Sequence, residues 1–387
     1  MILSYLLKRL RRHISVAFLS LLIVAIVVML LLGLSHYRES QQEKLDAVYE
    51  DFEIRCTLTN VSGARTTDLN ISDSYVGLFD GESGKLSAYA KDVFLLRSLR
   101  NATLREAADI DPALAENVAF YMTNDPESSA YLEGAVIQYA QDYVSESFGG
   151  DESICILNEK LTSYVSEAGT VYLYTPWGEM EARVVGTFLG DEPTVFVPWQ
   201  IWNDQLIASG QARKATAMAF TLADNHLLGE AKSALRDYFI PASRINKASN
   251  MHGLIIDDSL FIDTVVVLER SLALMRVVQV MVYVLSVGIS FLVAYLGIRG
   301  RRLELAVMRS LGTRRLAIYA EVLSEHILFF VMGASVACLL GVLLGLSMTQ
   351  SILSTVGVFM ICYLIGVALA VAQATSGQIM QILKGKE

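Results

Sequence analysis

Few residues of this chain could do chemistry, and the first candidates are Gly81, Gly84 and Lys85 in the stretch GESGK. Glycines and a lysine in a short loop bind phosphate when their spacing is that of a P-loop and a serine or threonine follows the lysine. Here the spacing differs from that motif, and Leu86 follows the lysine. We therefore interpret the stretch as a β-turn rather than a nucleotide site.

The histidines and cysteines also lack the spacing of a metal or catalytic site. The five histidines are scattered, and the sequence has no H-E-x-x-H, G-x-S-x-G or C-x-x-C motif. Cys338 and Cys362 fall in apolar stretches, where a small side chain packs well. Cys56 and Cys155 could form a disulfide, although two cysteines about a hundred residues apart are a weak signal. We expect no catalytic residue, no metal site and no directly bound cofactor, although missing motifs do not exclude an enzyme.

Four long apolar runs determine the class of protein. They are roughly Ile14–Leu34, Val277–Ile298, Ile327–Ser347 and Ile352–Thr375, and none contains a charged side chain. Each has about 20 residues, enough to cross a hydrocarbon core of ~30 Å as a helix. The first run could be a signal peptide, but it is long for one and no small-residue cleavage site follows it, so a retained anchor is favoured.

The charges flanking these runs predict the orientation. Four cations precede the first run, six arginines lie in the loop after the second, and two lysines lie in the tail. By the positive-inside rule, both termini and residues 299–326 are cytoplasmic in a multi-pass membrane protein. The chain carries a net −9 and these pieces carry +4, +3 and +1, so the remainder carries −17. An acidic outer part argues against nucleic-acid binding.

This topology predicts four transmembrane α-helices with an α+β extracytoplasmic domain inserted between spans 1 and 2 on a helical stalk. The expected parts are 1–34 (N-terminus and first span), 35–272 (extracytoplasmic domain with stalk helices) and 273–387 (the second to fourth spans with the loop after the second). The stalk seam is expected to be apolar, formed by Tyr37, Leu45, Val48, Leu260, Val267 and Leu268.

Alternation and apolar periodicity predict the elements of the inserted domain. Strands are expected at 54–58, 153–157, 170–174, 182–189, 194–197 and 215–222, and helices at 90–99, 158–165 and 226–238. The pattern is less regular over about 80–150, which could be a separate lobe.

The spans are poor in transport chemistry. Ion-coupled transporters keep ionisable groups at membrane depth, whereas here Arg276 and Glu325 lie near span ends, where long side chains extend to the interface. Energy must therefore come from elsewhere. Small residues recur every four positions in the third span and could serve helix packing within the chain or contact with a second copy. They are Gly333, Ala337, Gly341 and Gly345.

The segment between the second and third spans has the pattern of a short amphipathic helix, at about 302–312. Glu304 near its start and Arg309 near its end suit the helix dipole, and Gly312 suits the left-handed position after the last turn. Thr313, Arg314 and Arg315 then lead into the next helix. The alternative is an ordinary basic loop that only sets topology.

These residues carry a resemblance. The stretch RRLELAVMRSLGTRRLAIYAEVLSE resembles the motif that opens the third span of FtsX-like ABC-transporter permeases, and Glu304, Arg309, Gly312, Thr313 and Arg315 match it. Glu325 resembles the acidic residue at the start of that span, with a spacing one residue off. In the inserted domain, Val184–Gly186 and Val197–Pro198 resemble the periplasmic core of MacB-type permeases, whereas residues 60–150 show no such match.

The resemblance implies a permease that dimerises with a second copy or a sister permease. It also implies a cytoplasmic ABC ATPase seated under residues 299–326, with ATP and magnesium on that partner, and a location in the bacterial cell (inner) membrane. We expect the ATPase to be a separate polypeptide, and a membrane-fusion or adaptor protein to be a further partner. The cargo would be a peptide, a drug or a lipid-linked molecule. The alternatives are a regulator that activates an extracellular cell-wall hydrolase and a membrane-anchored sensor or adhesin.

Overall fold

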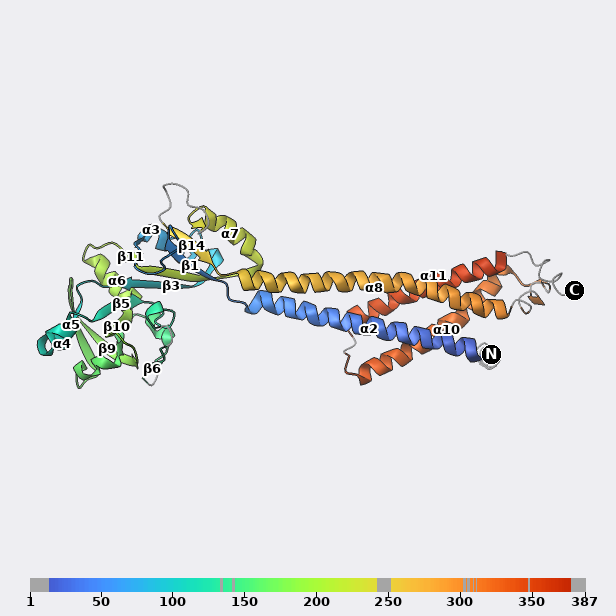
Figure 1. Ribbon diagram of the computed structural model, residues 1–387, viewed down its shortest axis with the longest axis horizontal. Helices are drawn as coiled ribbons and strands as arrows, with labels where there is room; N and C mark the ends of the chain where they lie inside the picture. The colour runs from blue at the N-terminus through green and yellow to red at the C-terminus, as the bar shows by residue number, and fades with distance from the viewer. Residues whose placement is uncertain are drawn as a thin grey trace. The chain divides into compact units, whose positions relative to one another are not determined.

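The computed structural model describes residues 14–132, 135–140, 143–241, 252–301, 304, 307, 308, 310, 312–346 and 349–376. The chain divides into two compact units. We call Tyr49–Ile262 the inserted unit, and Met1–Val48 with Asp263–Glu387 the helical unit. Figure 1 shows the elements of both.

The helical unit is built on four long helices, and each contains one of the apolar runs. They are α2 (Ile14–Asp51), α8 (Ser259–Gly300), α10 (Arg315–Leu343) and α11 (Gln350–Ser376). All four are long and apolar enough to cross a membrane. Val24, Val28, Phe359 and Val367 are among the buried side chains of their shared core. The chain is therefore a multi-pass membrane protein.

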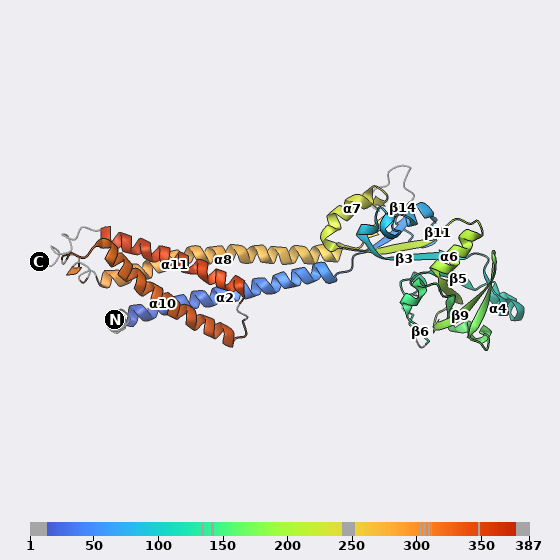
Figure 2. The same ribbon diagram turned by 180° about the vertical axis from the view of Figure 1, so that it is seen from behind.

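Helices α2 and α8 continue past their apolar runs without a break and lie side by side over the helical unit in both views (Figures 1 and 2). The expected seam is only partly correct. Leu45 is buried as expected, but Tyr37, Leu260 and Val267 are exposed, and Val265 is buried instead. The helical phase of α8 was misjudged because several adjacent residues there are apolar, so the periodicity does not select one face.

The inserted unit is a mixed sheet with short helices. Twelve strands of the described residues form one sheet, in the order β13-β14-β1-β12-β3-β5-β10-β7-β9-β8-β4, with β6 paired to β9. The pairs β10–β5, β7–β9 and β13–β14 are parallel and the other pairs are antiparallel. The strands of this sheet are β1 (Arg55–Asn60), β3 (Ala90–Ser98), β4 (Thr103–Leu104), β5 (Ala119–Thr123), β6 (Ile137–Tyr139), β7 (Ile154–Asn158), β8 (Thr170–Thr175), β9 (Gly178–Phe188), β10 (Thr194–Pro198), β12 (Ala217–Leu222), β13 (Ile240–Pro241) and β14 (His252–Ile256).

Two further strands, five α-helices and six short 3₁₀ helices are described in this unit. Strands β2 (Ile71–Ser72) and β11 (Lys214–Ala215) pair with each other. The helices are α3 (Asp73–Val76), α4 (Arg105–Ile110), α5 (Pro112–Ala115), α6 (Trp199–Ala208) and α7 (Leu228–Arg236). The expected strands correspond to β1, β7, β8, β9, β10 and β12, and the helix expected at 226–238 corresponds to α7. The helix expected at 158–165 is a 3₁₀ helix over Glu159–Tyr164.

The expectation of a helix at 90–99 is wrong. This stretch is strand β3, which lies between β12 and β5 in the middle of the sheet. The run Val93–Leu96 is apolar on consecutive positions, and a short run of this kind fits a central strand and a buried helix equally well. A separate lobe was an option for residues 80–150. The strands β3, β5 and β6 of this region belong to the same sheet as the other strands of that sheet before and after it in the chain.

The disulfide considered for Cys56 and Cys155 does not form, because both cysteines are free. Cys56 lies in β1 and Cys155 in β7, with four strands between them. At a strand spacing of ~4.8 Å they are about 24 Å apart, far beyond the ~7 Å limit between the Cα atoms of a disulfide. Burial raises the pKa of both thiols, that of Cys56 to about 12. Both therefore stay neutral thiols packed in the core.

His252 gives the inserted unit a predicted sensitivity to acid. Its ring is buried against Tyr75, and burial lowers its pKa below the ordinary value of 6.5. The unfolded chain then binds this proton more readily, so the contribution of His252 to stability falls as pH drops through 6.5. We expect the unfolding midpoint of the full-length protein to fall less between pH 7.5 and pH 5.5 in His252→Phe than in wild type. Equal falls in the two proteins would contradict this role.

Candidate functional site

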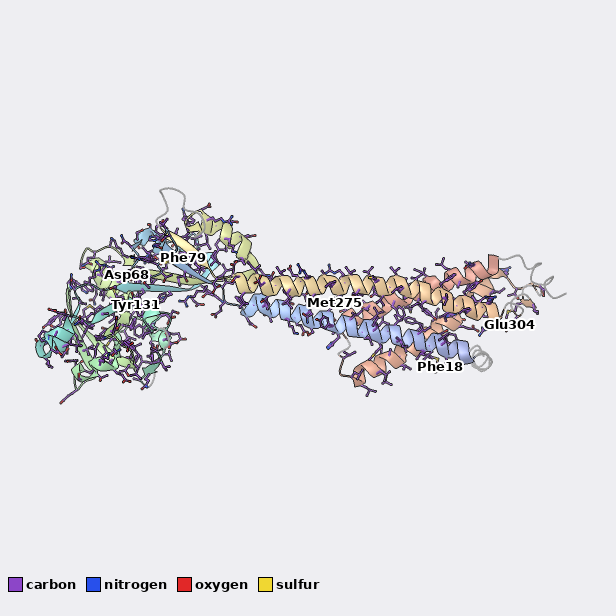
Figure 3. The ribbon with its side chains drawn as sticks, in the orientation of Figure 1. Phe18, Asp68, Phe79, Tyr131, Met275 and Glu304 are labelled. Carbon is purple, nitrogen blue, oxygen red and sulfur yellow. The ribbon has the colours of Figure 1, made fainter. Side chains whose placement is uncertain are left out.

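The loop between α8 and α10 contains the residues expected to contact an ATPase. Glu304, Val307, Met308 and Ser310 are helical, and Glu304 is exposed at this end of the helical unit (Figure 3). The Thr313 backbone N–H donates to the Met308 carbonyl oxygen at 3.2 Å, and Gly312 has φ +87°. A bond spanning six residues with a left-handed glycine inside it is a Schellman cap. Gly312 therefore has the left-handed conformation that the sequence predicts for it.

The residues after the cap also have defined places. Arg314 is the N-cap residue of α10, and Arg315 is its first residue. Arg314 is exposed and Thr313 is half-buried. Arg309 lies outside the described residues. Glu304 and Arg314 thus present opposite charges at the surface on either side of a fixed turn, an arrangement suited to a charged protein partner.

A buried ion pair joins this loop to the third span. The Arg301 guanidinium donates to the Glu325 carboxylate at 2.7 Å, and the two side chains are only 17% and 8% exposed. The expectation that Glu325 extends to the interface is therefore wrong. Two charges removed from water are stable only when paired, so this contact ties the C-terminal end of α8 to α10.

The residue after Glu325 makes a second connection. The ring nitrogen Nδ1 of His326 is 2.9 Å from the Tyr363 hydroxyl, and both side chains are buried. His326 also contacts Phe329 edge-on. The contact with Tyr363 connects α10 to α11. Arg301, Glu325 and His326 therefore link three helices close to the loop, and reasoning from the sequence did not identify Arg301, His326 or Tyr363 as partners.

A second polar cluster lies about 33 Å along α8 from Arg301, since Gln279 is 22 residues away at 1.5 Å per residue. The Gln279 side chain accepts from Arg38 at 3.1 Å and donates to Tyr283 at 2.9 Å and to Thr355 at 3.3 Å. Ser35 donates to Thr355 at 3.3 Å. These bonds connect α2, α8 and α11. Polar side chains inside otherwise apolar helices were the available sequence signal for this cluster.

The small residues of the third span have different roles. A Cβ on Gly333 would lie 2.9 Å from the Leu21 carbonyl oxygen and 2.9 Å from Val24 Cγ1, so Gly333 permits close packing of α10 on α2. Ala337 and Gly341 are buried. Gly345 instead lies beyond the end of α10 with φ +82°, where the Leu346 N–H donates to the Gly341 carbonyl. It ends the helix and does not belong to the packing face within the chain.

The C-terminal part of the chain matches a known family. Residues 276–379 match the FtsX-like permease C-terminal domain. No curated protein matches the chain.

Two solved structures are similar to this chain. One is the periplasmic region of MacB from Actinobacillus actinomycetemcomitans, at 9% identity and TM-score 0.32, covering 53% of this chain and 90% of that one. The other is the extracellular domain of the noncanonic ABC-type transporter YknZ from Gram-positive bacteria, at 11% identity and TM-score 0.30, covering 52% and 99%.

The family match covers α10, α11 and the part of α8 from Arg276 onward, together with the capped loop. It therefore includes Arg301, Glu325, His326 and Tyr363, the residues that join these helices. Residues 276–379 of this chain form an FtsX-like permease C-terminal domain.

Proposed function

We propose that this chain is the permease subunit of a MacB-type ABC transporter, and that it couples ATP hydrolysis by a separate ATPase to movement on the outer side of the membrane. The observation that carries the proposal is the exposed, capped turn at Glu304–Arg315 placed beside the buried Arg301–Glu325 pair. A partner can push on the turn, and the pair passes the displacement to two helices. The FtsX-like match over the same residues supports this reading.

The long helices suit the transmission of such a displacement. Helix α8 runs unbroken for 42 residues, about 63 Å at 1.5 Å per residue, and contains no proline. A continuous hydrogen-bonded helix moves as a rod, so a shift near Arg301 reaches the other end of α8. The cluster around Gln279 would carry α2 and α11 along with it.

We also propose the partners of this chain and its orientation in the membrane. Both termini and the capped turn face the cytoplasm, as the flanking cations indicate. ATP and magnesium bind to the partner ATPase. The permease functions as a dimer with a second copy or a sister subunit, and the cargo is a peptide, a drug or a lipid-linked molecule. A membrane-fusion or adaptor protein on the outer side of the membrane is a further partner.

A charge reversal at Glu304 tests the coupling role. We expect Glu304→Lys to lower stimulation of the co-purified ATPase at least tenfold, because the reversal opposes the helix dipole and removes an exposed charge from the partner surface. Arg309→Glu, a variant chosen from the sequence alone, should also lower stimulation of the ATPase. The measurement is ATPase activity of the full-length complex in lipid vesicles, with membrane insertion checked separately.

The matched control is Glu43→Lys, the same charge change at an exposed position of α2 far along the chain from the turn. It should leave ATPase stimulation unchanged. If Glu304→Lys and Arg309→Glu both keep full stimulation and full ATPase binding, the turn is not the coupling element. An isolated chain that co-purifies with an extracellular hydrolase instead of an adaptor would favour the regulator over the transporter.

A further inference from the structure

The inserted unit contains a cavity that the coupling role does not use. Its volume is about 560 Å³, within the ~300–1,000 Å³ typical of small-molecule sites. It lies where the end of β3, strand β11 and the turn between β8 and β9 meet. Asp68, labelled in Figure 3, is one of its lining residues.

The lining of this cavity is basic, although most of the chain is acidic. Arg97, Arg100 and Lys214 line it, with Asp68 as the single carboxylate, so the lining carries a formal +2. None of the three cations forms an ion pair within the described part of the chain. Residues outside the cytoplasmic pieces sum to −17. Unpaired cations gathered at one cavity in such a field create a local site of positive potential.

Arg97 is held in place before any ligand arrives. Its side chain donates to the Ala212 carbonyl oxygen at 3.1 Å, and burial lowers the pKa of its guanidinium, which nevertheless stays charged. The backbone beside it is fixed as well, since the Ser98 N–H donates to the Thr216 hydroxyl at 3.1 Å. A guanidinium has five N–H donors, and the remaining ones have no acceptor among the described residues.

The rim of the cavity contains strained backbone. Asp68 and Asn101 have φ of 54° and 63°, and they are two of the three non-glycine residues with positive φ in the described chain. Non-glycine residues adopt such conformations where the surroundings impose them. The backbone strain therefore indicates that the fold maintains the shape of the cavity around the three cations.

One wall of the cavity is apolar. Trp177 and Leu206 line it, and the Trp177 indole N–H points to the Met180 sulfur at 3.2 Å, which fixes the ring. An indole face beside a cluster of cations suits a ligand that has an anionic group next to an apolar or ring portion.

We propose that this cavity binds a phosphate-bearing ligand, with Arg97, Arg100 and Lys214 holding the phosphate and Trp177 packing against the adjoining part. A phosphate monoester carries about −1.5 to −2 at neutral pH, which matches the lining, whereas a carboxylate would leave a positive charge unmatched. Its three oxygens can accept from several donors at once. A soluble phosphorylated molecule and a phospholipid headgroup both present this chemistry, and the experiment below distinguishes them. The site does not depend on the coupling role.

Calorimetric titration of the full-length protein in neutral detergent micelles tests the site. The probes are glycerol 3-phosphate and dihexanoyl phosphatidic acid, with dihexanoyl phosphatidylcholine as the zwitterionic comparison. We expect Arg100→Gln/Lys214→Gln to weaken binding of the phosphate monoesters at least tenfold, since each charge-assisted bond contributes more than a neutral one. Both residues are exposed, so this variant leaves the core intact. Arg97→Gln should weaken binding to a similar extent.

The control is Lys91→Gln/Arg183→Gln, which removes the same charge from exposed positions that do not line the cavity. Its affinity should equal that of wild type. Equal affinity for the two phosphate probes identifies a soluble ligand, and at least tenfold tighter binding of the lipid identifies a headgroup. The site is refuted if wild type binds neither probe, or if the control variant loses as much affinity as the cavity variant.

Discussion

Replacing Glu325 with leucine is expected to destabilise the helical unit by about 3–5 kcal/mol, because Arg301 then stays buried without its carboxylate. Arg301→Leu should be similarly damaging, since it leaves the carboxylate buried instead. The measurement is the thermal unfolding midpoint of the full-length protein in detergent, together with its yield in the membrane. These are the largest effects we expect from any single side chain of the capped-turn region.

The double variant Arg301→Leu/Glu325→Leu separates stability from coupling. With both charges removed and apolar volume in their place, it should recover most of the stability lost by either single variant. If the pair also transmits displacement, ATPase stimulation should stay low in the double variant despite the restored fold. Single variants that unfold within about 1 kcal/mol of wild type would show that water reaches the pair and that it carries little energy.

The sequence was informative where a local rule decides the structure. Hydropathy predicted all four spans because a bilayer allows few alternatives to a long apolar helix. The left-handed conformation of Gly312 was predictable because the position after a helix favours glycine. Six of the fourteen described strands of the inserted unit were predicted from alternation and short apolar runs.

The sequence was uninformative where a partner from a distant segment decides the outcome. Glu325 could be placed near a span end, but Arg301 could not be identified as its partner, since that depends on how α8 and α10 pack. The same holds for Gln279, whose bonds reach α2 and α11. The cations of the cavity are dispersed over Arg97, Arg100 and Lys214, and only the tertiary fold of the inserted unit brings the end of β3 and strand β11 together. The prediction of a helix at 90–99 was wrong for a local reason, because the length and composition of this segment fit both a helix and a strand.

Gly366→Ala is expected to separate α11 from α8. A Cβ at this position would lie 2.0 Å from Ser290 Oγ and 2.4 Å from the Val287 carbonyl oxygen. The serine can rotate away, but the carbonyl belongs to the backbone of α8, so the two helices must move apart. Overpacking of this kind costs about 1–3 kcal/mol. We expect a lower unfolding midpoint and a loss of ATPase stimulation in the full-length complex.

Gly357→Ala is the matched control, because it makes the same substitution in the same helix at a position where an added Cβ meets nothing within 4 Å. Alanine forms helix better than glycine by about 1 kcal/mol, so this variant should be neutral or slightly stabilised. Adding Ser290→Ala to Gly366→Ala should give little recovery, since the Val287 carbonyl remains in place. Equal stability of Gly366→Ala and Gly357→Ala would mean that α8 and α11 are not in close contact. In that case a displacement of α8 would reach α11 through the polar bonds around Gln279 or through α10 by way of His326 and Tyr363, and the glycine would have no part in coupling.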